Sequence, residues 1–474
     1  MVPEKFRHQL RQEAEHWWQE GLIDRSVYEK IADRYQFSDI ENAARNRFTA
    51  ILMGLGGILM GLGTIIFVAA NWEAWSRVSR LMLLVSLFLG VNATGFYLWR
   101  KPIQPRSFQN LGQSLLLLGA LILGANMALV SQLFYESGNL YELFLAWGLG
   151  VATLSFSLRL KALGILAAIL LQIGYWIGFS RGFNAPQWSW GQLTIEHMPL
   201  VGIAILIPLA YWCRSRAIFG LGTIAVMTSF LANILRFEGW ILELAIGLPP
   251  ALFWGYTEGI WRFGRFRRSS TLLEFKFQSI ARSLSTIFIS LVLYAFSFNS
   301  WKSFQLGKLN IEQWQLLQYF TIDISILTAL TFLGLFQFRS PGKSIKVGKS
   351  KAVNSLTILA LIIISGSLVF WHLHIYSIAT SSTIAFNVML FLLAISLIRD
   401  GLAGGVRRTF WGGTFLLSVG IASRMLEYNT GLLLQSLVFV LCGVGVMVAG
   451  LAFEQNIKKS KHLANSNSFQ EESP

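Results

Sequence analysis

The chain has 474 residues, of which 54 % are hydrophobic and 13 % are charged, about half the charged share of ordinary soluble domains. So few charges cannot cover a soluble protein of this size, which excludes cytosolic enzymes, secreted disulfide scaffolds and disordered chains. The net charge of +15 would suggest nucleic-acid binding in a soluble chain. Here the basic residues lie in short loops between apolar segments, so we expect an all-α polytopic membrane protein that binds no nucleic acid.

The first 48 residues are polar and predict a small helical hairpin on the cytoplasmic side. A first helix carries Leu10, Ala14 and Trp17 on one side, and Gly21 is placed to end it. A second helix with apolar residues at four-residue spacing follows. Because a hairpin this small has little core of its own, it should pack either on the inner membrane surface or on a cytosolic partner. The sequence leaves both open.

Apolar runs of about 17–22 residues recur after this hairpin and predict about fourteen transmembrane helices. Five lie in a membrane domain over residues 49–180 and nine in a second membrane domain over 181–454, and residues 455–474 are expected to form a disordered cytoplasmic tail. The runs are 50–70, 81–99, 111–134, 142–158, 162–179, 198–213, 217–235, 239–257, 280–298, 317–338, 353–372, 378–398, 409–423 and 432–453.

The distribution of Lys and Arg predicts the orientation. If the N-terminus is cytoplasmic, 24 basic residues fall in the inward loops and tail, and only 7 fall in the outward loops. Cytoplasmic loops of membrane proteins carry such an excess. We therefore expect both termini in the cytoplasm, with the inward loops contacting anionic lipid headgroups of the bilayer.

The N-terminal third, about residues 10–180, also resembles a family of bacterial predicted membrane proteins defined by domain of unknown function 2157. The pieces that match are Trp17-Trp18 followed by Gly21-Leu22-Ile23, Ala69-Ala70-Asn71-Trp72-Glu73, Arg80, Ser131-Gln132-Leu133-Phe134-Tyr135, Gly138-Asn139, Trp147 and the turn Arg159-Leu160-Lys161. The resemblance implies a multi-pass protein of the bacterial inner membrane. It transfers no biochemical activity.

Two predicted outer loops gather polar residues into a candidate cluster at the outer face. Its members are Asn71, Glu73, Arg77, Arg80, Gln132, Tyr135 and Glu142. Paired carboxylates and guanidinium groups could hold a polar ligand or act as acid and base. The same residues, with the nearby Trp side chains, also fit an interfacial belt in which the charges face water.

Two acids are predicted at depth, where ionisation is costly and often functional. Asp323 lies about two turns inside its span, and Glu243 lies about one turn inside another. No Lys or Arg in the same span could pair with Asp323, so its carboxyl should be either protonated or paired. His372 and His374 are expected at an interfacial surface, and the buried Asn and Gln side chains should each make an interhelical hydrogen bond.

The sequence predicts no cofactor and no metal, because it has no nucleotide motif and no metal-ligand spacing. Cys213 and Cys442 are interpreted as small apolar side chains. Three hypotheses remain open. The chain could be a secondary transporter or flippase of a polar or lipid-linked substrate. It could instead be a membrane-embedded enzyme acting on a lipid-linked substrate at the outer face, or a non-catalytic assembly protein that uses its N-terminal hairpin.

Overall fold

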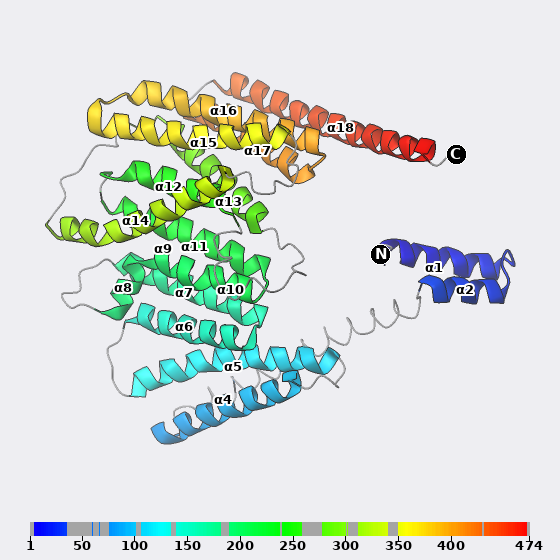
Figure 1. Ribbon diagram of the computed structural model, residues 1–474, viewed down its shortest axis with the longest axis horizontal. Helices are drawn as coiled ribbons and strands as arrows, with labels where there is room; N and C mark the ends of the chain where they lie inside the picture. Colours follow the sequence, from blue (N-terminus) through cyan, green and yellow to red (C-terminus); the bar gives the residue numbers. More distant parts are fainter. Residues whose placement is uncertain are drawn as a thin grey trace. The chain divides into compact units, whose positions relative to one another are not determined.

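The computed structural model describes most of the chain, and all regular structure within the described residues is helical (Figure 1). The all-α prediction is thereby confirmed. The described residues are 4–35, 59, 66, 75–100, 106–133, 139–181, 189–237, 239–257, 277–299, 301, 311–339, 349–428 and 431–471. The chain divides into two compact units, Met1–Gly138 and Asn139–Pro474. The boundary at residue 138 differs from the predicted boundaries at 48 and 180.

The first unit begins with the predicted helical hairpin, α1 (Glu4–Gln19) and α2 (Arg25–Tyr35). Ala14 is completely buried between the two helices, and Trp18 stacks on Tyr28 at 5.3 Å between ring centroids. Gly21 adopts φ +72°, a left-handed conformation that glycine takes without strain, and so lets the chain reverse direction.

Two long apolar helices, α4 (Arg77–Arg100) and α5 (Arg106–Leu133), pack against each other in the same unit. Their closest approach depends on glycine, because a Cβ atom on Gly112 would lie 2.6 Å from the backbone N of Trp99 and 2.8 Å from the carbonyl O of Gly95. Asn126 of α5 donates to the carbonyl O of Leu84 in α4 at 3.2 Å. Small residues and one interhelical hydrogen bond therefore join the pair, as is common in membrane helices.

The second unit is a bundle in which sequential helices lie side by side (Figure 1). Its elements are α6 (Leu140–Leu158), α7 (Lys161–Arg181), α8 (Trp190–Glu196), α9 (Met198–Val201), η1 (Gly202–Leu206), α10 (Ile207–Trp212), α11 (Arg216–Leu235), α12 (Leu242–Trp254), α13 (Phe277–Phe296), α14 (Ile311–Arg339), α15 (Lys349–Phe370), η5 (Trp371–Ile375), α16 (Ala379–Gly404), α17 (Arg407–Glu427) and α18 (Leu432–Glu471). The two η elements are π-helical turns.

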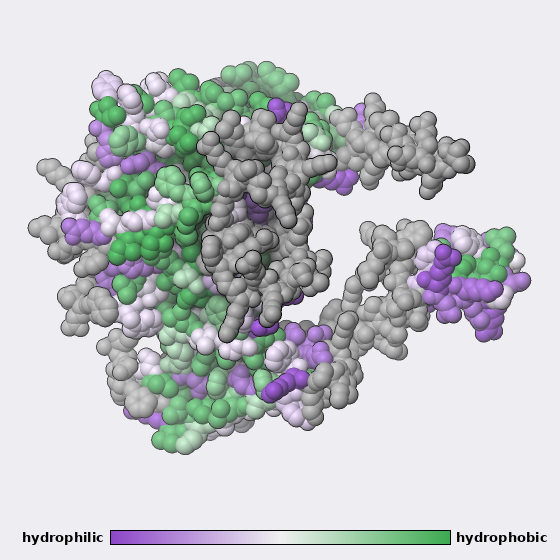
Figure 2. All heavy atoms as spheres, in the orientation of Figure 1, coloured by the Kyte–Doolittle hydropathy of each residue, from purple (hydrophilic) through white to green (hydrophobic). Residues whose placement is uncertain are grey.

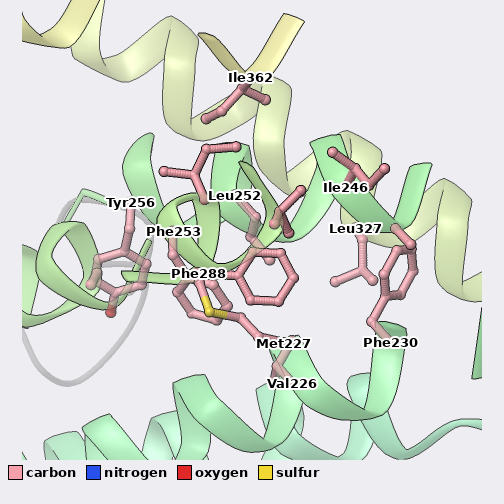
Figure 3. Close-up of a cluster of buried hydrophobic side chains, with 14 of the residues drawn as sticks. Val226, Met227, Phe230, Ile246, Leu252, Phe253, Tyr256, Phe288, Leu327 and Ile362 are labelled. Atoms are coloured by element: carbon pink, nitrogen blue, oxygen red, sulfur yellow. The ribbon is translucent and has the colours of Figure 1, made fainter. Parts of the chain in front are cut away.

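The core of this unit surrounds the short helix α12, which contacts α11, α13, α14 and α15. Figure 3 shows apolar side chains from these helices meeting there, among them Phe230, Phe253, Phe288 and Leu327. Each of these four side chains is at most 9 % exposed. The apolar core of this unit therefore lies between α11, α12, α13, α14 and α15.

Nine helices in the described residues are long and apolar enough to cross a membrane, or ten if the bent pair α8 and α9–α10 counts as one span. The predicted count of fourteen is therefore not confirmed. The first predicted span, 50–70, lies outside the described residues except for Leu59 and Ile66. The other thirteen predicted spans each coincide with a helix, but α12 and the apolar part of α14 are short, and α17 carries charged residues at both ends.

The exposed faces of these helices are largely apolar, whereas the α1–α2 hairpin has a mixed, more polar surface (Figure 2). Exposed Leu, Ile, Val and Phe side chains lie along α4, α16 and α18 in particular. So many exposed apolar side chains within each unit require a lipid environment, so this is a multi-helix membrane protein in contact with the bilayer. At the C-terminus α18 continues to Glu471, where a disordered tail was predicted.

Candidate functional site

A sharp break immediately precedes the sixth predicted span, 198–213. Helix α8 ends at Glu196, and the segment Met198–Trp212 continues at an angle of 82°. Pro199 follows the break, and the π-helical turn η1 and Pro208 lie within the second half. Proline removes a backbone donor and π-helical turns mark irregular, frequently functional, helix segments. His197 occupies the break itself, with φ −100° and ψ 23°.

The backbone carbonyls freed by the break are satisfied from a neighbouring helix. Asn233 of α11, 3 % exposed, donates through Nδ2 to the carbonyl O atoms of Ile195 and Glu196, at 3.3 and 2.9 Å. Tyr175 of α7 donates through its hydroxyl to Asn233 Oδ1 at 3.0 Å, with the carbonyl O of Ser229 also within reach at 3.2 Å. The break is therefore a supported element, because irregular backbone in a membrane persists only where its polar groups find partners.

The imidazole at the break pairs with the buried acid. His197 Nδ1 lies 2.5 Å from Oδ2 of Asp323 on α14, 126 residues further along the chain. Asp323 is completely buried, whereas the His197 side chain is 17 % exposed. Oδ1 of Asp323 has no hydrogen-bond partner in the described part of the chain. The pair can share one proton, carried by either the carboxyl or the imidazole, and only the histidine side of the pair is exposed at the surface of the bundle.

A cation, Arg236, lies near Glu196 at the break. Arg236, the residue that follows α11, places its guanidinium 4.0 Å from the ring centroid of Phe179 and donates to the carbonyl O of Phe179. Burial lowers the pKa of Arg236 to about 10, and the charges of Tyr175 and Glu196 act in the opposite direction. Arg236 therefore stays positive at neutral pH and contributes positive potential near the break.

The other predicted deep acid also has a histidine partner. Glu243, in the first turn of α12, faces His374 of η5 at 3.7 Å between Oε2 and Nε2. The two side chains are 18 % and 21 % exposed. Trp240 contacts both the His374 ring and Trp314 of α14, at centroid distances of 6.3 and 5.9 Å. This group is more open than the His197–Asp323 pair. Sequence reasoning missed both histidine partners, because they lie on distant segments and no pattern links them to the acids.

Two further polar side chains near helix ends are buried, and one of them was predicted at the surface. His372 is buried, accepts a hydrogen bond at Nδ1 from the backbone N–H of Ile378, and lies 3.2 Å from the carbonyl O of Trp301 through Nε2. The prediction of a surface histidine was wrong here, because the π-helical turn η5 directs this ring into the bundle. Arg424, in the last turn of α17, is 7 % exposed and pairs with Glu427 and the carbonyl O of Ser297.

The predicted outer-face cluster is only partly described. Asn71, Glu73 and Tyr135 lie outside the described residues, as does the side chain of Gln132. Arg77 and Arg80 lie in the first turn of α4, and Arg80 donates to the carbonyl O of Trp75 at 3.1 Å. Glu142 lies in the first turn of α6, in the second unit. The cluster remains a prediction.

The uncharged polar side chains at depth mostly behave as expected. Asn126, Gln172, Asn233 and Asn387 each bond to another helix or to the turn after α13. Cys213 is a free, buried thiol and Cys442 a free, half-buried one. The described residues contain no group of three or more His, Cys, Asp or Glu side chains that could hold a metal ion.

Comparison with known proteins gives one result. The model of a family described as "Predicted membrane protein (DUF2157)" matches residues 15–164. No curated protein and no solved structure matches the chain. The family match agrees with the resemblance seen in the N-terminal third and with a membrane protein of several apolar helices. The match ends before His197, so both carboxylate–histidine pairs lie outside the matched residues.

Proposed function

We propose that this protein is a secondary transporter in which the His197–Asp323 pair carries the coupling proton. The observation that supports it best is the pair itself, a completely buried carboxylate 2.5 Å from an imidazole at the break of a discontinuous helix. Secondary transporters commonly place substrate and ion sites at such broken helices, near the middle of the membrane.

The geometry of the pair fits proton exchange. An isolated carboxylate in an apolar bundle is costly, so loss of the proton from Asp323 is tolerable only while His197 can take it or stay bonded to it. Because His197 is partly exposed and Asp323 is not, a proton would pass between solvent and the acid through the imidazole. A change in angle at the break would move His197 relative to α14 and so control access to the acid.

A reconstituted system tests this proposal. The full chain is placed in liposomes with an acidic interior and a trapped pH-sensitive dye, and sodium, potassium, amino acids, sugars and organic amines are added outside in turn. We expect one class of solute to move protons through the parent, and Asp323→Asn and His197→Gln to abolish that movement at equal incorporation. Glu454→Gln removes an exposed acid that pairs with Arg407, and serves as the matched control. Unchanged proton movement in Asp323→Asn would contradict the proposal.

For localisation we propose a bacterial inner-membrane protein with both termini in the cytoplasm. The support is the excess of Lys and Arg in alternate loops. The enzyme hypothesis depends on the outer-face cluster, and the assembly hypothesis on a partner for the α1–α2 hairpin. Neither is supported by a described contact comparable to the His197–Asp323 pair.

A further inference from the structure

We infer that the cluster formed by Glu243, His374, Trp240 and Trp314 is a binding site for an organic cation, a molecule with an amine or quaternary ammonium group. The suggestion that such cations are the transported substrates rests on the proposed function. The binding site itself can be tested without transport. We call these four residues the aromatic–acid cluster.

The carboxylate supplies the charge that a cation requires. Glu243 Oε2 has no hydrogen-bond partner among the described residues, and neither has Nε2 of His374, which faces it at 3.7 Å. At 3.7 Å this contact is longer than a hydrogen bond, so a neutral His374 leaves Oε2 of Glu243 without a hydrogen-bond donor. The Glu243 side chain is 18 % exposed, so a ligand would approach the acid from its exposed side, because Oε2 itself is buried against His374.

The aromatic rings supply the selectivity for an organic cation. Trp240 and Trp314 lie 5.9 Å apart, Trp314 is 47 % exposed, and Phe370 adds a ring 4.8 Å from His374. Indole faces attract weakly hydrated cations such as alkylammonium groups, and Trp is the most effective ring for this. A small inorganic cation would need several oxygen ligands, which the described part of this cluster does not provide.

The position of the cluster connects it to the proton pair. Trp314 and Asp323 are both on α14, nine residues apart, which corresponds to about 13 Å along the helix. Between them Phe320 packs on Phe230 and Phe237, at centroid distances of 5.5 and 5.8 Å. A cation held at the cluster would thus lie one aromatic layer away from the buried acid.

Equilibrium binding to the purified full chain tests the inference. Isothermal titration compares choline with its neutral isostere 3,3-dimethylbutan-1-ol, at constant ionic strength in sodium chloride. We expect choline to bind at least tenfold more tightly than the alcohol. Glu243→Gln should weaken choline binding about tenfold or more, and Trp314→Leu about 2- to 30-fold. His374→Arg, which supplies a permanent internal cation, should abolish binding. Glu454→Gln should leave it unchanged.

Three results would overturn the inference. They are equal affinity for choline and the alcohol, unchanged choline affinity in Glu243→Gln, and competition by sodium at concentrations similar to those of choline. Choline binding that depends on Glu243, with proton movement unaffected by Asp323→Asn, would keep this site and reject proton coupling. Loss of proton movement in Asp323→Asn without any choline binding would keep proton coupling and reject this cation site.

Discussion

Replacing Asn233 with Leu should destabilise the broken helix, because this side chain satisfies two of its carbonyl groups. The substitution keeps the approximate volume but removes the donors to the carbonyl O atoms of Ile195 and Glu196. Each interhelical hydrogen bond in a membrane protein contributes about 0.6 kcal/mol and at most about 1.7. A buried acceptor left without a partner costs about 1–3 kcal/mol. We therefore expect a loss of about 2–4 kcal/mol in the free energy of unfolding.

Unfolding by sodium dodecyl sulfate in mixed micelles, followed by circular dichroism, measures this loss. Gln172→Leu is the matched control, because it also removes one buried amide. The amide of Gln172 donates to Thr228 Oγ1, which keeps its own bond to the carbonyl O of Ile224, so about 0.5 kcal/mol is expected. If Asn233→Leu were no less stable than Gln172→Leu, the carbonyls at the break would not depend on Asn233 and the reasoning would be refuted.

Three further outcomes are expected. Gly112→Leu should separate α4 from α5 and cost about 1–3 kcal/mol in the same titration, whereas Gly90→Leu, with nothing within 4 Å of its Cβ position, should be nearly neutral. Reporter fusions after Trp188 and after Arg216 should report opposite sides of the membrane, and the same side for both would mean that the bent segment re-enters without crossing. Histidine ¹⁵N NMR of the parent and His372→Gln should show that His372 carries its proton on Nε2 at neutral pH, and a proton on Nδ1 would contradict its bond to Ile378.

Most of the helical framework could be predicted from the sequence, because apolar length and loop charge are local properties. The alternation of apolar runs with basic turns located a helix at each described span, including the segment over 198–213. What composition could not reveal was the 82° break at His197, immediately before that segment. Pro199 and Pro208 suggested an irregular helix. The break itself, however, depends on Asn233 of α11, which donates a hydrogen bond to the carbonyl O of Glu196.

In each candidate site the sequence predicted the acid but not its histidine partner. Asp323 and Glu243 could be identified from the sequence because a charged carboxylate inside an apolar run is energetically costly and therefore unusual. Their partners His197 and His374 carry no such signal, since a histidine near a predicted loop is ordinary. The sequence left open whether the carboxyl of Asp323 is protonated or paired, and the structure places His197 Nδ1 beside it. The partner itself follows from tertiary packing of segments 126 residues apart.

Infrared difference spectroscopy on a change of pH tests the central claim, that His197 and Asp323 form a proton-binding pair, most directly. The parent chain in lipid vesicles should show a protonated-carboxyl band that responds to pH and to deuterium oxide, and Asp323→Asn should remove that band. His197→Gln should shift the band and the pH at which it appears, whereas Glu454→Gln should alter neither. Spectra that are identical for the parent, Asp323→Asn and His197→Gln would show that no exchangeable proton resides at the pair, and would contradict the account.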